Sequence, residues 1–279
     1  MVHIVADTIS SIPVEEAKRL KLPYLPQIII FGEESFKDDS EIDSETFLKK
    51  LKNSKELPKT AAPYPVLYNP IFEKLGKTKE PILVLCPPAT VSGTVRSAEI
   101  AKNDFPNTEI HILDTTILAA GLGSLVRKAL FWAQKGDSVE TIIAKVKEMA
   151  TRNRTYFLLD TLEYLRRGGR IGAAKALVGG ILQMKPLLAF RNSQVEPVES
   201  QRTKSKAIKS LINLVQKECP QSKEAYFCIQ EGGEKKEAAE LSNEIGKLMG
   251  FKNIPMYTVP PAILVHGGPG IIGVSYFVE

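Results

Sequence analysis

Two hydroxyl side chains flank a glycine at Ser92, Gly93 and Thr94, directly after an apolar run and at the start of a predicted helix. Backbone N–H groups at a helix start attract anions, the glycine permits close approach, and both hydroxyls can hydrogen-bond an oxyanion. The same pattern is typical of an ordinary helix N-cap, which the motif alone favours. Because no acid–histidine pair adjoins Ser92 in the sequence, a nucleophilic serine is not indicated.

Further polar residues stand where other predicted strands end. Asp7 and Thr8 follow one apolar run, Thr60 lies in a turn before Pro63, and residues 114–116 (Asp-Thr-Thr) follow another run. Ligands of open parallel sheets bind at the carboxyl ends of the strands. We therefore expect these groups and Ser92 to converge on one edge of a sheet.

A cluster of arginines and glycines occupies positions 166–170 (RRGGR). A guanidinium after a glycine pair can clamp a carboxylate or a phosphate. Arg166 and Arg167 also fit the last turn of a helix that ends in glycine. Arg170 lies beyond that end, which makes it the candidate for ligand binding.

His266 interrupts an apolar, strand-like C-terminal stretch and is followed by Gly267, Gly268 and Gly270. A satisfied core histidine is the default interpretation, but adjacent glycines indicate that the backbone passes close to a neighbouring strand or a ligand. The three histidines show no paired spacing, so no metal site is predicted.

Nucleotide motifs are incomplete in this chain. The G-x-G in residues 121–125 (GLGSL) lacks a third glycine at the required spacing, which favours close helix packing as its cause. The glycines after His266 are not followed by the Lys-Ser/Thr of a P-loop. We predict no cofactor.

The composition is that of an ordinary globular chain of 279 residues with a net charge of +5. No basic stripe interleaved with aromatics suggests nucleic acid, although a transient contact with an anionic membrane surface stays open. The three cysteines form no CxxC and are expected to be buried, reduced thiols. The chain start has no signal-peptide pattern and no apolar run reaches the about 18–20 residues of a membrane span, so we expect a cytoplasmic protein.

Strand and helix patterns alternate through the first half of the chain, which predicts βαβ units and a doubly wound parallel sheet. The predicted strands are 3–7, 26–32, 81–87 and 109–114, and the predicted helices are 13–21, 44–53 (capped by Ser44), 92–104, 121–136 and 138–153. After residue 150 the regular alternation of strand and helix patterns changes. We therefore predict an N-terminal α/β domain at 1–150 and a C-terminal α/β domain at 151–279. The elements expected there are strands 155–160, 224–230, 253–262 and 270–279, helices 162–172 and 234–250, and a strand running into a helix over 195–218.

Several motifs occur in order along nearly the whole chain, and together they resemble the DegV family of bacterial fatty-acid-binding proteins. They are an apolar strand ending in Asp-Thr (3–8), a Thr-x-x-Pro segment (60–63), SGTVRSA (92–98), ILDTTILAAGLG (112–123), DTLEYLRRGGRI (160–171), KPLL (185–188) and HGGPGIIG (266–273). This chain departs from the family pattern at Ala61, at residues 86–90 (CPPAT) and at Gly172, where serines are usual. The departures leave room for a different acyl ligand or for a member that has no kinase partner.

The resemblance implies two α/β domains with a ligand tunnel between them, partly lined by residues 173–184. Ser92 and Thr60 would hydrogen-bond a fatty acid carboxylate, while His266 and Arg170 would complete the polar end of the tunnel. The predicted ligand-binding residues are Thr60, Ser92, Gly93, Thr94, Arg170, His266 and Gly267. The family also implies a partner, an ATP-dependent fatty acid kinase that receives the bound acid and forms an acyl phosphate for phospholipid synthesis, so the chain itself would not be an enzyme.

Two alternatives of other classes remain at this stage. A lipid-sensing regulatory module without a kinase would share the same pocket. An enzyme that binds phosphate or nucleotide through Ser92, Thr94 and Arg170 is the less favoured alternative, because the nucleotide motifs are incomplete. Lipid extraction from the purified protein separates a lipid binder from a nucleotide enzyme, and a coupled kinase assay separates a carrier from a sensor.

Overall fold

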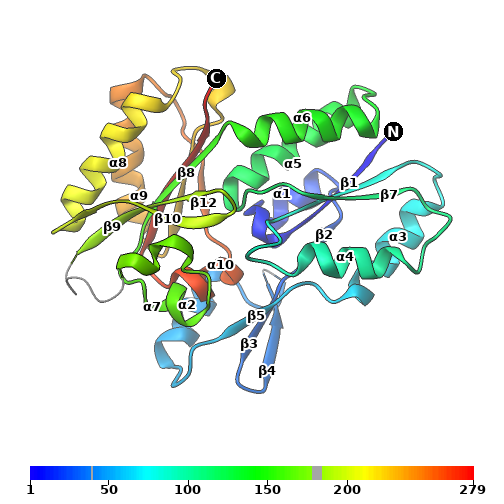
Figure 1. Ribbon diagram of the computed structural model, residues 1–279, viewed down its shortest axis with the longest axis horizontal. Coiled ribbons are helices and arrows are strands. Elements are labelled where there is room, and N and C mark those ends of the chain that lie inside the picture. The colour runs from blue at the N-terminus through cyan, green and yellow to red at the C-terminus, as the bar shows by residue number, and fades with distance from the viewer. Residues whose placement is uncertain (39, 178–183) are drawn as a thin grey trace. The chain divides into compact units, whose positions relative to one another are not determined.

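A computed structural model describes residues 1–38, 40–177 and 184–279 (Figure 1). The chain forms two compact units, one of Met1–Ile42 with Pro58–Thr151 and the other of Asp43–Leu57 with Arg152–Glu279. The predicted division at residue 150 differs from these units in one segment, Asp43–Leu57, which packs with the second unit.

A parallel four-stranded sheet forms the centre of the first unit, as predicted. Its order is β2 (Tyr24–Leu25), β1 (His3–Asp7), β6 (Ile82–Cys86), β7 (Ile110–Asp114). The strand expected at 26–32 forms as β3 (Ile28–Phe31), but it pairs antiparallel with β4 (Glu34–Lys37) and β5 (Lys59–Ala61) in a separate small sheet (Figure 1). Thr60 therefore lies in a strand, opposite Ile29, so the prediction that it lies in a turn was wrong.

Helices cover both faces of the parallel sheet, which explains its continuous apolar strands. The helices in contact with the sheet are α3 (Asn69–Gly76) and α4 (Thr94–Lys102), which lie against β6, and α5 (Ala119–Gln134), which lies against β1. The first unit also contains α1 (Val14–Arg19) and α6 (Val139–Thr151). On one face, Val5, Val84 and Cys86 pack with Phe72 of α3 and Ala98 of α4. α5 packs against β1 and against α6.

Within its described residues, the second unit has a six-stranded sheet in which four of the five strand pairs are antiparallel and the pair β11–β12 is parallel. The order is β10 (Gln194–Gln201), β9 (Lys185–Arg191), β8 (Asn153–Leu158), β13 (Ile271–Phe277), β11 (Cys228–Gly232), β12 (Met256–Thr258). α8 (Lys204–Glu218) and α9 (Lys235–Met249) bury their apolar stripes on one face of this sheet, where Leu211 and Leu241 join Val274 in a core. The unit's other helices are α2 (Ser44–Asn53), α7 (Glu163–Arg167) and α10 (Pro261–Gly267).

Two local predictions were wrong. The residue that caps α2 is Asp43, whose carboxylate accepts the N–H of Thr46 at 2.7 Å. Ser44 instead donates to the carbonyl of Val259 at 2.8 Å, which ties α2 to the second unit. His266 lies in the last turn of helix α10 and not in a strand, because Pro260 and Pro261 start a helix there and Gly268 ends it.

The three cysteines are free and buried, as predicted. Within the described ranges, no helix has both the length and the apolar character needed to cross a bilayer.

Candidate functional site

A buried hydrogen-bonded cluster lies at the carboxyl end of the parallel sheet. Thr94 donates its hydroxyl to Oδ2 of Asp7 at 3.0 Å, and the side-chain amide of Gln27 donates to the same oxygen at 2.6 Å. The Gln27 amide also reaches the Thr94 hydroxyl at 3.0 Å. Ser92 completes the cluster, with its Oγ 2.8 Å from Oγ1 of Thr94.

The alternation of β1 explains why Asp7 is in this cluster. Asp7 is two residues after Val5 and so points to the same face, the face that α3 and α4 cover. Thr94 is the first residue of α4, and small residues behind it, Ala98 and Ala101, let the helix approach the sheet closely. The last side chain of β1 therefore meets the first side chain of α4.

Ser92 is the outer member of the cluster. It is partly exposed, whereas Thr94 and Asp7 are each 1% exposed. Its hydroxyl also accepts the N–H of Thr94 at 3.3 Å, so the N-cap interpretation is partly correct. Gly93, the N-cap residue of α4, makes no side-chain cap.

The segment that carries Thr60 lies beside this turn. A β-carbon at Gly93 would stand 3.4 Å from the Cβ of Ala62, and Ser97 donates its hydroxyl to the carbonyl of Pro63. Thr60 itself is partly exposed in β5. The structure thus brings the Thr60 segment and the Ser92 turn together within the first unit.

Asp114 fixes the loop that leads into Ser92. Its carboxylate accepts the N–H of Ala89 at 2.9 Å and the N–H of Thr116 at 2.8 Å. Thr115 donates to the carbonyl of Cys86 at 2.8 Å. The ends of β1, β6 and β7 therefore meet at one edge, as their polar residues predicted.

Burial raises the pKa of Asp7 to about 7. The hydrogen bonds that its carboxylate accepts from Thr94, Gln27 and the Ile9 backbone act in the opposite direction and limit this increase. Two other titratable groups face it. Burial raises the pKa of the Tyr68 hydroxyl and of the Cys86 thiol, and the nearby Asp7 charge adds to both shifts. Both groups are consequently neutral at pH 7.

The second unit holds the other predicted polar residues, His266 and Arg170. Burial and, to a smaller extent, the positive charge of Arg170 lower the pKa of His266 to about 4. Arg170 donates from Nη1 to the carbonyl of Gly168 at 2.8 Å. The result is a neutral imidazole with a guanidinium in its neighbourhood, a pair that can donate hydrogen bonds to an anion.

The glycines around His266 serve packing within the second unit. A β-carbon at Gly168 would overlap Nδ1 of His266, and one at Gly268 would overlap the ring of Tyr164. Gly268 also has a φ of 74° and Gly270 a φ of 82°, and a β-carbon at Gly270 would overlap the carboxylate of Asp160. Gly267 is buried against the side chain of Ile271. The end of α10 is thereby pressed onto α7.

Two motifs have structural explanations. Arg166 forms a two-pronged ion pair with Glu163 at 2.8 and 2.9 Å, and Arg167 also binds Glu163, so both belong to the end of α7 as the cap interpretation predicted. In the G-x-G motif, a β-carbon at Gly123 would overlap the carbonyl oxygen of Ser10. That glycine lets α5 pack on the turn that follows β1.

Gln27 was not among the residues predicted for the site, and Asp7 was not among the predicted ligand-binding residues. Gln27 is 3% exposed, and its backbone N–H also binds the Thr8 hydroxyl at 3.0 Å. The available signal was a single amide residue between Pro26 and the apolar run of β3. Residues 178–183, part of the predicted tunnel lining, lie outside the described residues.

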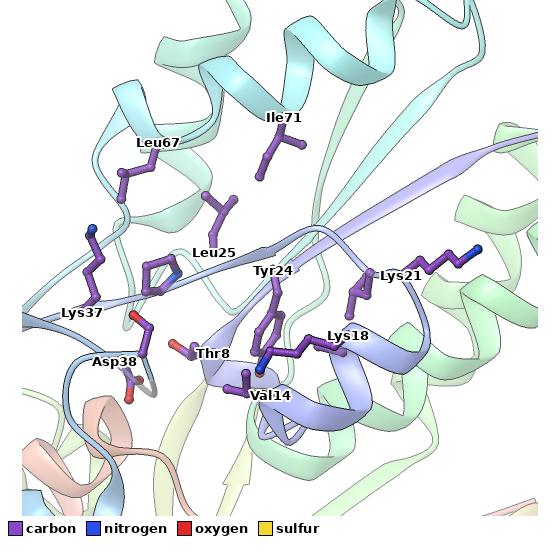
Figure 2. Close-up of a pocket in the computed structure, with 14 residues that line it drawn as sticks. Thr8, Val14, Lys18, Lys21, Tyr24, Leu25, Lys37, Asp38, Leu67 and Ile71 are labelled. Atoms are coloured by element: carbon purple, nitrogen blue, oxygen red, sulfur yellow. The ribbon is translucent and has the colours of Figure 1, made fainter.

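A separate pocket of about 460 Å³ opens beside α1 and α3 in the first unit (Figure 2). Figure 2 shows Leu25, Leu67 and Ile71 on one side of it and Thr8 and Asp38 on the other. Two of its lysines pair with carboxylates, Lys18 with Glu15 and Lys37 with Glu41, and the acidic Asp38 is buried in its wall. None of the seven predicted ligand-binding residues lines it, although Thr8, which was expected at the same sheet edge, does.

Among the described side chains, no group of three His, Cys, Asp or Glu residues is arranged to hold a metal ion. The oxygen and nitrogen groups of both clusters are suited to hydrogen-bonding an anion. Their assignment to a ligand stays a prediction.

Comparisons with known proteins match the chain over its whole length. The family model described as "Uncharacterised protein, DegV family" matches residues 1–279. The chain is 28% identical to protein DegV of Bacillus subtilis over 278 residues, covering 99% of this chain and 98% of that protein. Among solved structures, it superposes with a DegV family protein from Thermus thermophilus, described by its fatty acid binding, with a TM-score of 0.92 at 25% identity, covering 100% and 99% of the two chains. The crystal structure of Bacillus subtilis DegV, described as a fatty acid binding protein, superposes with a TM-score of 0.88 at 28% identity over 100% and 99%.

Proposed function

The chain belongs to the DegV family, and from this membership together with the two polar clusters we propose that it binds a long-chain fatty acid. The observation that carries the proposal is the partly exposed Ser92 hydroxyl, held at a helix start by the buried Thr94 and Asp7. It is the kind of group that can receive a carboxylate.

The relatives support this ligand class. The Thermus thermophilus and Bacillus subtilis proteins, both described as binding fatty acids, share 25% and 28% identity with this chain over nearly its whole length. Ser92, Thr60, Arg170 and His266 stand at positions that match the family motifs. They are the residues that we propose for the head group, with Gly93, Thr94 and Gly267 shaping the site around them.

The energetics of such binding divide between tail and head. Burying about fifteen methylenes contributes at most roughly 12 kcal/mol, at about 0.8 kcal/mol each. Burying a carboxylate without partners would cost several kcal/mol, so the tail drives binding only when the head group is hydrogen-bonded. We propose that Ser92, Thr60 and the His266–Arg170 pair supply those hydrogen bonds. The inter-domain tunnel for the tail stays a prediction.

We further propose that the chain acts as a carrier and not as an enzyme. It would present the carboxylate to a separate ATP-dependent kinase, and the acyl phosphate so formed would enter phospholipid synthesis. These steps come from the family resemblance. A coupled assay with a fatty acid kinase, ATP and tetradecanoate tests them, and a protein that binds the acid without supporting acyl-phosphate formation would be a lipid sensor instead.

Lipid extraction and native mass spectrometry of protein purified from its expression host test the binding itself. We expect one fatty acid per chain and a loss of that ligand on delipidation. The Ser92→Ala variant should retain less of it than Ser138→Ala, which removes an exposed serine hydroxyl at the start of α6. Protein that carries no acyl ligand and takes up none when incubated with tetradecanoate would contradict the proposal.

A further inference from the structure

Two consecutive hydrogen bonds link three oxygen groups into a line from the surface of the first unit to its interior. Ser92 Oγ lies 2.8 Å from Thr94 Oγ1, and Thr94 Oγ1 lies 3.0 Å from Oδ2 of Asp7. Ser92 is partly exposed, while Thr94 and Asp7 are buried. The line therefore connects a carboxyl group out of reach of water to a hydroxyl at the surface.

Gln27 restricts how protons can be arranged along this line. Its side-chain amide donates to Oδ2 of Asp7 at 2.6 Å and to the Thr94 hydroxyl oxygen at 3.0 Å. The Thr94 hydroxyl has one proton of its own, which goes either inward to Asp7 or outward to Ser92. At 2.8 Å, the oxygens of Ser92 and Thr94 need a proton between them.

Each protonation state of Asp7 then allows only one arrangement of the hydroxyl protons of Thr94 and Ser92. When Asp7 is ionised it accepts from Thr94, and Ser92 must donate inward to Thr94. When Asp7 is protonated it donates to Thr94, Thr94 donates to Ser92, and the Ser92 proton points outward. Toward the solvent, Ser92 Oγ can therefore only accept a hydrogen bond when Asp7 is ionised, and it can donate one when Asp7 is protonated.

We propose that Asp7 and Thr94 are positioning residues that set the direction of the Ser92 hydroxyl, so that the protein holds an anionic head group when Asp7 is protonated and releases it when Asp7 is ionised. The inference rests on the proposed function, in which Ser92 contacts the fatty acid carboxylate. Binding and proton uptake are then coupled, and a change of the protonation of one buried carboxyl group changes the affinity for the ligand.

The electrostatic surroundings of Asp7 fit this role. Its pKa of about 7 lies at near-neutral pH, so a small change of pH changes the fraction of Asp7 that is protonated. The titratable groups that face it are Cys86 on β6 and Tyr68 before α3, and both stay neutral in this range because burial raises the pKa of each. With a pKa of about 4, His266 does not change its charge between pH 6 and 8.5 in the ligand-free protein.

Calorimetric titration with monomeric tetradecanoate between pH 6 and 8.5 tests the coupling, in two buffers of different ionisation enthalpy. The ligand is ionised throughout, since a carboxylic acid of this kind titrates at about 4–5. We expect uptake of up to one proton per ligand above pH 7. We also expect the dissociation constant to rise, by up to tenfold in the first pH unit above the pKa of Asp7, because the protonated form binds the ligand more tightly.

Two variants interrupt the line at different points. Asp7→Asn removes the titrating group, and Thr94→Val removes the hydroxyl that relays its state. Both should bind tetradecanoate with a dissociation constant that is flat from pH 6 to 8.5 and without proton uptake. If one variant fails to fold, the other still decides the question.

A matched control is the second unit's buried Glu231, whose carboxylate accepts a threonine hydroxyl, that of Thr258, at 2.7 Å. Glu231→Gln should keep the wild-type pH profile. Proton uptake that persists in Asp7→Asn would assign the coupling to another group, such as His266, and would overturn the inference, as would a flat wild-type profile. Absence of tetradecanoate binding at every pH would instead contradict the proposed function, and the inference with it.

Discussion

The imidazole of His266 occupies the place where a side chain at residue 168 would begin. A β-carbon on Gly168 would overlap Nδ1 of the ring. The φ of Gly168 is −74°, a value open to any residue, so space and not backbone conformation requires glycine there. The glycine that ends α7 and the histidine of α10 therefore pack directly against each other.

Gly168→Ala should displace the His266 ring and so expose it. We expect the pKa of His266 to move up from about 4 toward its ordinary value as water reaches the ring. The chain has three histidines, so proton NMR titration of their ring C–H signals can follow each one. Gly169→Ala is the control, because its φ of +70° makes alanine strained while nothing lies within 4 Å of the new carbon. Equal His266 pKa values in the two variants would contradict this account.

The low pKa of His266 makes the folded protein sensitive to acid. The unfolded chain protonates this imidazole below its ordinary pKa of 6.5, whereas the folded chain does so only near 4. The contribution of His266 to stability is therefore full above pH 6.5 and is lost as the pH falls from 6.5 toward 4. The raised pKa of Asp7 acts in the opposite direction over this range, but equally in the wild type and in a His266 variant. Urea unfolding at pH 7.5 and pH 5 should show a smaller pH-dependent loss for His266→Gln than for the wild type. An identical loss in both proteins would show that other groups cause the acid sensitivity.

The parallel sheet could be predicted because its strands are continuous apolar runs with polar residues at their ends. The same reasoning brought Asp7, Ser92 and Asp114 to one edge, since the carboxyl ends of parallel strands share that edge. The bond between Asp7 and Gln27 could not be predicted, because it joins β1 to a residue 20 positions away that leads into a different sheet.

Helix α10 shows where local pattern misleads. Its apolar residues resemble those of a buried strand, but two prolines begin it and glycine follows its histidine, which are helix start and stop signals. The placement of α2 with the second unit depends on contacts such as that between Ser44 and Val259, 215 residues apart. No local pattern contains that information.

Gly123→Ala should destabilise the first unit by about 1–3 kcal/mol, the usual cost of inserting a carbon into a packed contact. The new carbon would overlap the carbonyl oxygen of Ser10 and approach the guanidinium of Arg127. Gly32→Ala serves as the control, because its β-carbon would meet nothing within 4 Å and only its φ of +59° is unfavourable. Denaturant unfolding measures both. A stability unchanged by Gly123→Ala would mean that α5 shifts freely on the turn after β1.

Ser92→Ala should affect presentation of the ligand more than its retention. Most of the affinity is expected from the apolar tail, so loss of one hydrogen bond to a charged head group should weaken tetradecanoate binding about tenfold, or ~1.4 kcal/mol. The carboxylate then loses the group that orients it, and acyl-phosphate formation by a fatty acid kinase should fall further than tenfold even at saturating ligand. Calorimetric binding and the coupled kinase assay are compared on the same protein, with Ser138→Ala expected to match the wild type in both. Equal losses in binding and turnover would show that Ser92 contributes affinity alone.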